Sequence, residues 1–362
     1  MFDSKTRAIT KRAFRRNPFT LIVSDQGDLS DFETTVWRGD KRARRWVAVA
    51  VDSSPTKRAT ILNAEHLALQ GDSVVATSAD KTVKITGEAV DGSHKAFRTP
   101  EGPSFTIDSW RAENRHVMKV MLASTEQSGF TPLLSTVLFR PLGSTTVSTT
   151  ATDRFMLSRG TLETTSKPVE FSACVPQRIV SELATTPAWH LTVWESHSVA
   201  EFCETGVRVQ MMNYETSSAG FPQVDHLFPE YTPSETNEWT VTPGEFAKAL
   251  RRLDPPRHTP VGISGDGRIA SEGSGVLRPA GVIETTSSDA APKWIAFNHE
   301  YLTRLLASMT AYRTVRLKWS TRNTQSHNDR PIQLEVSPRL DAILMPARGG
   351  GSSFEVDATI EL

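Results

Sequence analysis

The sequence has few of the features that mark secreted, membrane-spanning or metal-binding proteins. Its only two cysteines, Cys174 and Cys203, are too few for a disulfide framework and lack the clustered spacing of a zinc ribbon or redox pair. No stretch approaches the ~18 apolar residues that a membrane span needs, and the basic N-terminus has no apolar segment behind it. We therefore expect a soluble protein of a reducing cytoplasm, without membrane contact.

The chain also lacks an excess of charge of either sign. Its 362 residues include 41 Lys and Arg and 41 Asp and Glu, so the formal net charge is zero. No global positive charge is available to hold a polyanion, and any nucleic-acid surface must be local. A content of 38% hydrophobic residues allows sizeable cores. A prior of roughly 100 to 200 residues per domain predicts two or three domains, and we favour three.

Catalytic signatures are missing as well. The sequence contains no phosphate-binding G-x-x-x-x-G-K-S/T, no H-E-x-x-H and no G-x-S-x-G, and its nine histidines lack metal-ligand spacing. The segment from Gly265 to Gly267 is typical of a hairpin turn between strands. Asp225 and His226 are adjacent, so on a strand or loop they would point apart. We expect no enzymatic activity and no cofactor.

Strand patterns dominate what is present. Segments such as RWVAVAVD (45–52), WHLTVWE (189–195), VRVQMM (207–212) and IQLEVSP (332–338) alternate or run apolar between turn-forming residues, which predicts antiparallel sheet. Helices are predicted at residues 111–124, 176–185, 242–253 and 298–311, each opening with a cap or an early proline. In the third helix Thr242 precedes Pro243 and stands three residues before Glu245, as in a capping box.

The order of these elements is repeated. From about Phe105 the chain reads strand, helix, strands, helix, strands, and from about Trp239 the same order begins again. The helices recur after about 120 to 130 residues, so the repeat is domain-sized and not a solenoid. Residues 1–102 have room for a third copy, with candidate helices at 6–16 and 62–70. We expect three domains, at 1–102, 103–238 and 239–348, and a C-terminal extension at 349–362.

Four short segments carry a resemblance to a known family. ATDRFML at 151–157 is similar to the ATDxxxL segment of the bacterial DNA polymerase III beta subunit, the DNA sliding clamp. FPEY at 228–231 resembles that family's FPDY segment, FNHEYL at 297–302 its FNxxYL helix start, and LMPAR at 344–348 its final MPxR strand. The four occur in the family's order, over about residues 103–348.

The resemblance implies an α+β fold of three similar clamp domains, each with antiparallel sheets outside and two helices facing the centre of a ring. Two subunits would join head to tail as a homodimer, and six domains would encircle double-stranded DNA. A clamp loader would place the ring on DNA, where it would tether a replicative DNA polymerase as a processivity factor. It would work in the cytoplasm at the replisome, or in the host cytoplasm if a phage encodes it.

Topology retains a ring on DNA, so weak, salt-dependent and sequence-independent phosphate contacts suffice. Arg111, Arg115 and Lys119 stand four residues apart on one predicted helix, and Lys248, Arg251 and Arg252 cluster on another. For any one of them the alternative interpretation is a solvated helix face. The residues expected to face DNA are Arg12, Arg16, Arg111, Arg115, Lys119, Arg178, Lys248, Arg251, Arg252 and Arg304.

In the resembled family, partners insert a short peptide with apolar anchors into a pocket between the second and third domains. Carried over by position, the second-domain wall would comprise Leu134, Thr152, Arg154, Phe155, Met156 and Leu157, with Pro229 at the junction. The third-domain wall would comprise Asn298, Tyr301, Ile343, Leu344, Met345, Pro346, Ala347 and Arg348, with His258 and Pro331 beside them. Leu, Met and Pro suit an apolar trough, and Asn298 and Arg348 can bond a peptide backbone or carboxylate. For the aliphatic members the alternative is ordinary sheet core.

The sequence departs from the family in four places, one of which is Pro233-Ser234 where the family has a basic-aliphatic pair after the FPDY segment. Arg154, Phe155 and Met156 stand where the family commonly has Gly-His-Arg or Arg-Tyr-Arg, which predicts a more apolar and differently shaped pocket. The segment 131–133 lacks the aromatic pair that some clamps place near single-stranded DNA. Residues 349–362 continue past the last strand, and can add an edge strand or fold back towards the pocket. Two alternatives stay open: a clamp-like adaptor or inhibitor that does not encircle DNA, and a DNA-processing hydrolase with scattered carboxylates.

Overall fold

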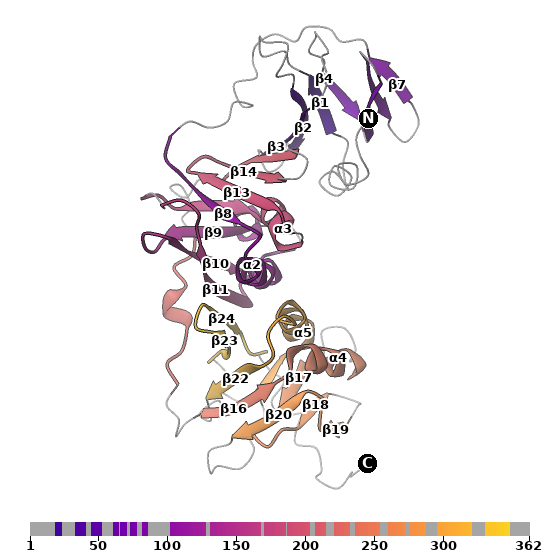
Figure 1. Cartoon of the computed structure of the whole chain (residues 1–362). Helices are drawn as coiled ribbons and strands as arrows, with labels where there is room; N and C mark the ends of the chain where they lie inside the picture. Colours follow the sequence, from indigo (N-terminus) through magenta and orange to yellow (C-terminus); the bar gives the residue numbers. More distant parts are fainter. Residues whose placement is uncertain are drawn as a thin grey trace. The chain divides into compact units, whose positions relative to one another are not determined.

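The computed structural model describes most of the chain from residue 102 to residue 347 and the backbone of seven strands before it (Figure 1). The described ranges are 19–23, 33–40, 45–52, 61–64, 66–70, 73–77, 82–85, 102–127, 131–167, 170–185, 187–202, 207–214, 221–231, 236–253, 260–271, 275–286, 295–320 and 330–347. The fold is α+β, as the strand and helix patterns predict. Among the described helices, none is long and apolar enough to cross a membrane.

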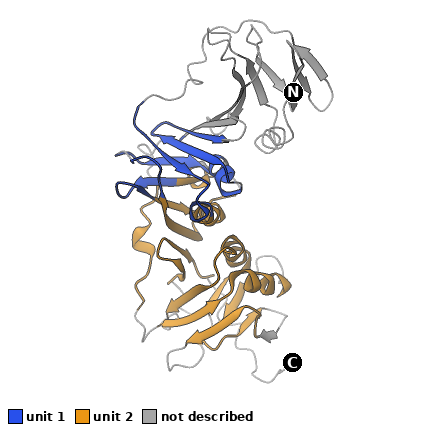
Figure 2. Cartoon of the chain, viewed as in Figure 1, with its two compact units in different colours: residues 1–115, 138–147, 163–220 blue, residues 116–137, 148–162, 221–362 orange. Residues whose placement is uncertain are grey.

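The chain forms two compact units, of which the first comprises residues 1–115, 138–147 and 163–220 (Figure 2). This unit holds an antiparallel sheet of eight strands in the order β4-β1-β2-β3-β15-β14-β13-β8. The strands of the sheet are β1 (Phe19–Val23), β2 (Glu33–Asp40), β3 (Arg45–Asp52), β4 (Ile61–Ala64), β8 (Ser104–Asp108), β13 (Trp189–Trp194), β14 (His197–Phe202) and β15 (Val207–Met212). The unit also contains β5 (His66–Gln70), β6 (Ser73–Thr77), β7 (Thr82–Ile85), β12 (Ala173–Pro176) and the helix α3 (Gln177–Thr185).

The second unit comprises residues 116–137, 148–162 and 221–362. Its smaller sheet has the order β19-β18-β17-β21, and its larger one includes the run β24-β23-β22-β16-β20. Its strands are β16 (Thr236–Val241), β17 (Pro260–Ile263), β18 (Ile269–Ser271), β19 (Gly275–Leu277), β20 (Val282–Thr286), β21 (Ile295–Asn298), β22 (Val315–Ser320), β23 (Ile332–Ser337) and β24 (Leu340–Leu344). The helix α4 (Pro243–Leu253) packs against α5 (His299–Ser308), and two short 3-10 helices are η2 (Pro132–Ser135) and η3 (Asp225–Leu227) (Figure 1).

Four elements have residues in both units: α2 (Ala112–Ser124), β9 (Thr136–Pro141), β10 (Thr146–Thr152) and β11 (Met156–Glu163). With them the predicted repeat is complete. The order β8, α2, four strands, α3, three strands is followed by β16, α4, five strands, α5, three strands. The sheet neighbours agree as well, because β8 pairs with β13 as β16 pairs with β22. The turn predicted at 265–267 joins the antiparallel pair β17 and β18.

The four helices predicted between residues 111 and 311 are present, with small corrections at the ends. All four helices begin one residue after the predicted start, and α5 ends at Ser308 because the Met309 amide already bonds Leu306 in the tighter 3-10 pattern. The expected capping box at Thr242 is wrong. The Thr242 amide donates to the carbonyl of Gly281 (2.7 Å) and not to Glu245. The Glu245 carboxylate instead accepts a hydrogen bond from the Lys248 ammonium (2.9 Å).

The helix predicted at 62–70 is also wrong, because this segment forms β4 and β5. Ala, Leu and Glu favour helix locally, but β5 is paired residue by residue with β6, whose sequence SVVAT is rich in strand formers. Pairing with a partner strand therefore outweighs the local preference. The helix predicted at 6–16 lies outside the described residues.

Aromatic side chains occupy the core beside the first strand of each repeat. In the first unit Phe105 of β8 is fully buried, with ring centroids 5.6 Å from Phe171 and 6.4 Å from Phe139. In the second unit Trp239 of β16 lies edge-on to Phe246 and Trp319, each at 5.7 Å. Such rings bury large apolar area, so each repeat centres on one aromatic cluster.

Candidate functional site

The turn between β10 and β11 is tightly bonded. The carboxylate of Asp153 accepts the amides of Phe155 (3.0 Å) and Met156 (2.8 Å). The hydroxyl of Thr152 donates to the Met156 carbonyl (2.8 Å) and accepts the Arg154 amide (3.1 Å). These bonds hold Arg154 at a φ of 82°, in the left-handed region that favours glycine. A non-glycine residue in this region is strained, and such residues cluster at functional sites.

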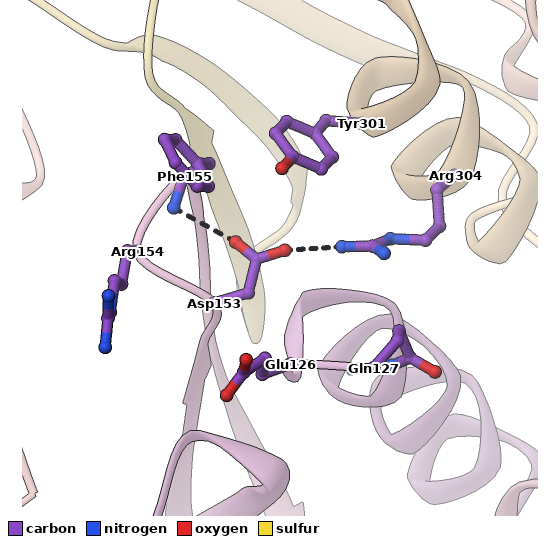
Figure 3. Close-up of a pocket in the computed structure, with 7 residues that line it drawn as sticks. All are labelled: Glu126, Gln127, Asp153, Arg154, Phe155, Tyr301 and Arg304. Atoms are coloured by element: carbon purple, nitrogen blue, oxygen red, sulfur yellow. Dashed lines mark hydrogen bonds and ion pairs between the residues drawn. The ribbon is translucent and has the colours of Figure 1, made fainter. Parts of the chain in front are cut away.

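An opening of about 280 Å³ lies beside this turn (Figure 3). It is bounded by the residues that follow α2, by the β10–β11 turn and by the first turns of α5. The lining residues are Glu126, Gln127, Asp153, Arg154, Phe155, Tyr301 and Arg304. All of them belong to the second compact unit.

An ion pair joins the β10–β11 turn to α5. The guanidinium of Arg304 lies 2.5 Å from the Asp153 carboxylate, and only 7% of the Asp153 side chain is exposed against 32% of Arg304. Burial raises the pKa of Asp153, while the amide of Met156, the charge of Arg304 and the amide of Phe155 act in the opposite direction. The carboxylate therefore holds two backbone amides and one guanidinium at once. We call this pair the Asp153–Arg304 clip.

Two stacked rings form one side of the opening. The rings of Phe155 and Tyr301 have centroids 5.4 Å apart and planes inclined by 20° (Figure 3). Phe155 is 52% exposed, so about half of this large apolar side chain is accessible to solvent. Burial and the charge of Asp153 raise the pKa of Tyr301, so its hydroxyl stays protonated at neutral pH. The pair offers a ligand a flat aromatic surface with a polar edge.

The aliphatic residues predicted as a peptide trough are buried in this structure. Their exposed fractions are 4% for Leu134, 1% for Met156, 3% for Leu157, 1% for Ile343 and 0% for Leu344. Strands β11 and β24 bring four of them together, because Met156 is opposite Leu344 and Leu157 opposite Ile343. Phe228 packs against this cluster from the segment before β16. In this structure the five residues are therefore part of the sheet core, which was the alternative interpretation of the sequence.

The remaining predicted pocket residues lie around these two features. The Met345 amide donates to the Phe155 carbonyl (2.8 Å), which ties the end of β24 to the turn. The side chain of Asn298 caps α5 by accepting the Glu300 amide (2.9 Å). Pro229, Pro331, Pro346 and Ala347 are half-buried, and the Pro331 carbonyl accepts the Tyr231 hydroxyl. His258 and Arg348 lie outside the described residues.

Sequence reasoning missed part of the lining. Glu126, Gln127 and Asp153 were not among the predicted pocket residues, and Arg304 was expected to face DNA. Asp153 had a signal, since it stands inside the ATDxxxL segment. Arg304 had one too, because it follows Tyr301 by three residues and so shares its helix face.

The basic residues expected to face DNA differ in how they are engaged. Before α2, Arg111 forms ion pairs with Asp108 and Glu163. Arg115 donates to the backbone carbonyls of Ser109 and Trp110, which precede the helix, while Lys119 is exposed. The positive charge of Arg111 is therefore largely compensated.

On α4 the Lys248 ammonium pairs with Glu245 at 2.9 Å, and Arg251 and Arg252 are exposed at the end of the helix. Arg304 is held in the clip. Arg12 and Arg16 and the side chain of Arg178 lie outside the described part of the chain. Within that part, no group of three or more His, Cys, Asp or Glu could hold a metal ion.

The strained turn predicts a stabilising substitution. Arg154→Gly should raise the free energy of unfolding by about 0.5 to 1 kcal/mol, because glycine accepts a positive φ without steric cost and this outweighs its greater freedom when unfolded. Denaturant midpoints with unchanged slopes would measure it. Arg313→Gly is the control: Arg313 is exposed and has no positive φ, so the same exchange should be neutral or destabilising. Destabilisation by Arg154→Gly would contradict the strain.

Solved structures of similar fold identify the architecture. No protein-family model matches the chain, and no curated protein matches its sequence. The DNA polymerase III beta subunit of Thermotoga maritima is similar with a TM-score of 0.63 at 15% identity, over 94% of this chain and 95% of that one. The DNA polymerase beta subunit of Streptococcus pyogenes gives 0.66 at 13%, over 94% and 96%. The DNA polymerase sliding clamp of Pseudomonas aeruginosa gives 0.61 at 13%, over 94% and 97%. The chain thus has the fold of the DNA polymerase III beta subunit sliding clamps.

Proposed function

We propose that this chain is a DNA sliding clamp, a processivity factor that encircles double-stranded DNA and tethers a replicative polymerase. The observation that carries the proposal is the likeness of fold to beta-subunit clamps along nearly the whole length of both chains. A likeness confined to one domain would leave ring closure without support. A repeated α+β unit at 103–238 and 239–348, with a third at 1–102, is what a six-domain ring of two head-to-tail subunits requires.

The charge distribution suits a protein that slides. A chain with equal numbers of basic and acidic residues has no global positive charge to hold DNA, and a ring that is retained by topology does not need one. Exposed basic residues on two helices, Lys119 on α2 and Arg251 and Arg252 on α4, supply weak phosphate contacts without base readout. Such contacts weaken steeply with salt, while topological retention does not.

The opening beside the β10–β11 turn is the proposed docking site for partner peptides, including those of the polymerase and the clamp loader. It combines an aromatic wall, Phe155 and Tyr301, with polar groups from three chain segments. Pockets of this kind fix a short extended peptide by one or two anchors and a few directed hydrogen bonds. Neither catalysis nor a cofactor enters this role.

Retention on circular DNA tests the proposal. We expect light scattering to give the mass of two chains, and the loaded protein to stay on nicked circles at high salt but to leave after the circle is cut. The difference is expected because a closed ring cannot leave a circle but can slide off a free DNA end, whatever its affinity for DNA. A monomer, or equal loss from circles and linear DNA, would contradict encirclement and favour an adaptor that binds replication proteins without enclosing DNA.

A further inference from the structure

The acidic groups of the opening already hold hydrogen-bond donors. Asp153 is almost buried and accepts two backbone amides and the Arg304 guanidinium. An oxygen of Glu126 accepts the Thr131 amide at 2.7 Å. A ligand that brings a further donor, such as an ammonium group, therefore finds the Asp153 carboxylate almost covered and one oxygen of Glu126 already bonded.

Arg154 offers the opposite chemistry. It is exposed, and within the described residues its guanidinium makes one hydrogen bond, to the Thr131 hydroxyl at 2.8 Å. A guanidinium has five N–H donors in a planar fork, so most of them remain for a ligand. No carboxylate among the described residues pairs with it. Its positive charge is thus uncompensated at the edge of the opening.

The fold fixes where this charge stands. The left-handed backbone at Arg154 is held by the Thr152 hydroxyl on one side and by the amides that Asp153 accepts on the other. The bond to Thr131 restrains the far end of the side chain. A side chain whose backbone and guanidinium are both restrained loses less conformational freedom when it binds a planar anion.

The neighbour of this charge is an aromatic wall. Phe155 follows Arg154 directly and presents more than half of its side chain to solvent, stacked on Tyr301. The aliphatic residues Leu157 and Ile343 are buried, and Phe228 packs against them. A peptide in this opening therefore meets the guanidinium of Arg154, which forms no ion pair with a described residue, directly beside an exposed aromatic surface.

We infer that this opening binds a carboxylate of the partner peptide, with Arg154 as the residue that selects it and the Phe155–Tyr301 stack holding an adjacent apolar side chain. The inference rests on the proposed peptide-docking function. Planar guanidinium and carboxylate groups match in two parallel hydrogen bonds, which gives selection as well as attraction. The carboxylate can belong to an Asp or Glu side chain or to a free C-terminus.

Three synthetic peptides separate the sources. Each carries two leucines and a phenylalanine as apolar anchors and a fluorescent label; the first has one Glu and an amidated C-terminus, the second Gln in its place, and the third Gln with a free C-terminus. Anisotropy titrations with the full chain should give a dissociation constant roughly threefold to tenfold lower for the first or the third peptide than for the second. The preference should shrink as salt is raised.

Arg154→Gly is the decisive variant, since glycine suits the local backbone and the fold is retained. In this variant the three peptides should bind alike, whereas Arg313→Gly, which removes an exposed charge that does not line the opening, should keep the preference. Equal binding of the three peptides to the unaltered chain, or a preference that survives Arg154→Gly, would overturn the inference and leave the docking site standing. Binding of no peptide would overturn both, while retention on circular DNA would still report on the ring.

Discussion

Asp153→Ala is expected to weaken peptide binding by about tenfold or more and to lower the free energy of unfolding by about 3 kcal/mol. The substitution removes the acceptor of two backbone amides and leaves the Arg304 guanidinium without its partner. Breaking a buried pair costs roughly 3 to 5 kcal/mol, and the exposure of about a third of Arg304 reduces this. Without the clip the β10–β11 turn and α5 no longer fix the Phe155–Tyr301 stack. Peptide titrations and chemical denaturation measure the two effects.

Two further variants separate charge from geometry. Asp153→Asn keeps an oxygen for the amides of Phe155 and Met156 but loses the ionic bond, so it should cost less than alanine. Combining Asp153→Ala with Arg304→Met removes the unpaired charge, and should recover part of the stability but not the peptide affinity. Unchanged peptide affinity in Asp153→Ala, at full stability of the fold, would show that the clip does not position the site.

The sequence predicts the four helices from residue 111 onward and the strand segments named above, but it assigns residues 62–70 to the wrong element, for a physical reason. The helices begin at local signals, such as Pro243 at the first position of α4 and Asn298 as the cap of α5, and these act within one turn. Residues 62–70 lack such a signal and form strands because a partner strand pairs with them. The strand β2 had no marked pattern, and its place between β1 and β3 follows from pairing alone. The repeated order of elements partly makes up for the missing local signals, because the interpretation of one copy supports that of the other.

The candidate site is predicted less completely than the fold. Positional likeness indicated the β10–β11 turn and Tyr301, and the structure brings these together at the opening. It did not indicate that Leu157 and Ile343 would be covered by Phe228, because a sequence position does not fix whether an apolar residue faces a pocket or the core. The clip also escaped prediction. Asp153 and Arg304 are 151 positions apart, and an ion pair over that separation leaves no local pattern.

Trp239→Ala should lower the free energy of unfolding of the second unit by about 4 kcal/mol. Trp239 is fully buried, contacts Phe246 of α4 and Trp319 of β22, and donates from its ring nitrogen to the Ser264 carbonyl at 3.1 Å. Truncating a buried aromatic costs roughly 3 to 5 kcal/mol through lost burial and the cavity left behind. Circular dichroism during denaturation would detect the shift, and peptide binding should fall with it because α4 packs against α5, which carries Tyr301.

Graded substitutions show whether packing is the cause. Trp239→Phe keeps most of the apolar volume and removes one of the two donors to the Ser264 carbonyl, which also accepts the Gly267 amide (3.3 Å), so it should cost about 1 to 2 kcal/mol. Trp110→Ala is the exposed counterpart: its side chain is 57% exposed, and its loss should change stability by no more than about 0.5 kcal/mol. A small effect of Trp239→Ala, equal to that of Trp110→Ala, would contradict the aromatic cluster as the centre of this repeat. An intermediate Trp239→Phe would instead show that the ring stabilises the repeat both by its volume and by the hydrogen bond from its ring nitrogen.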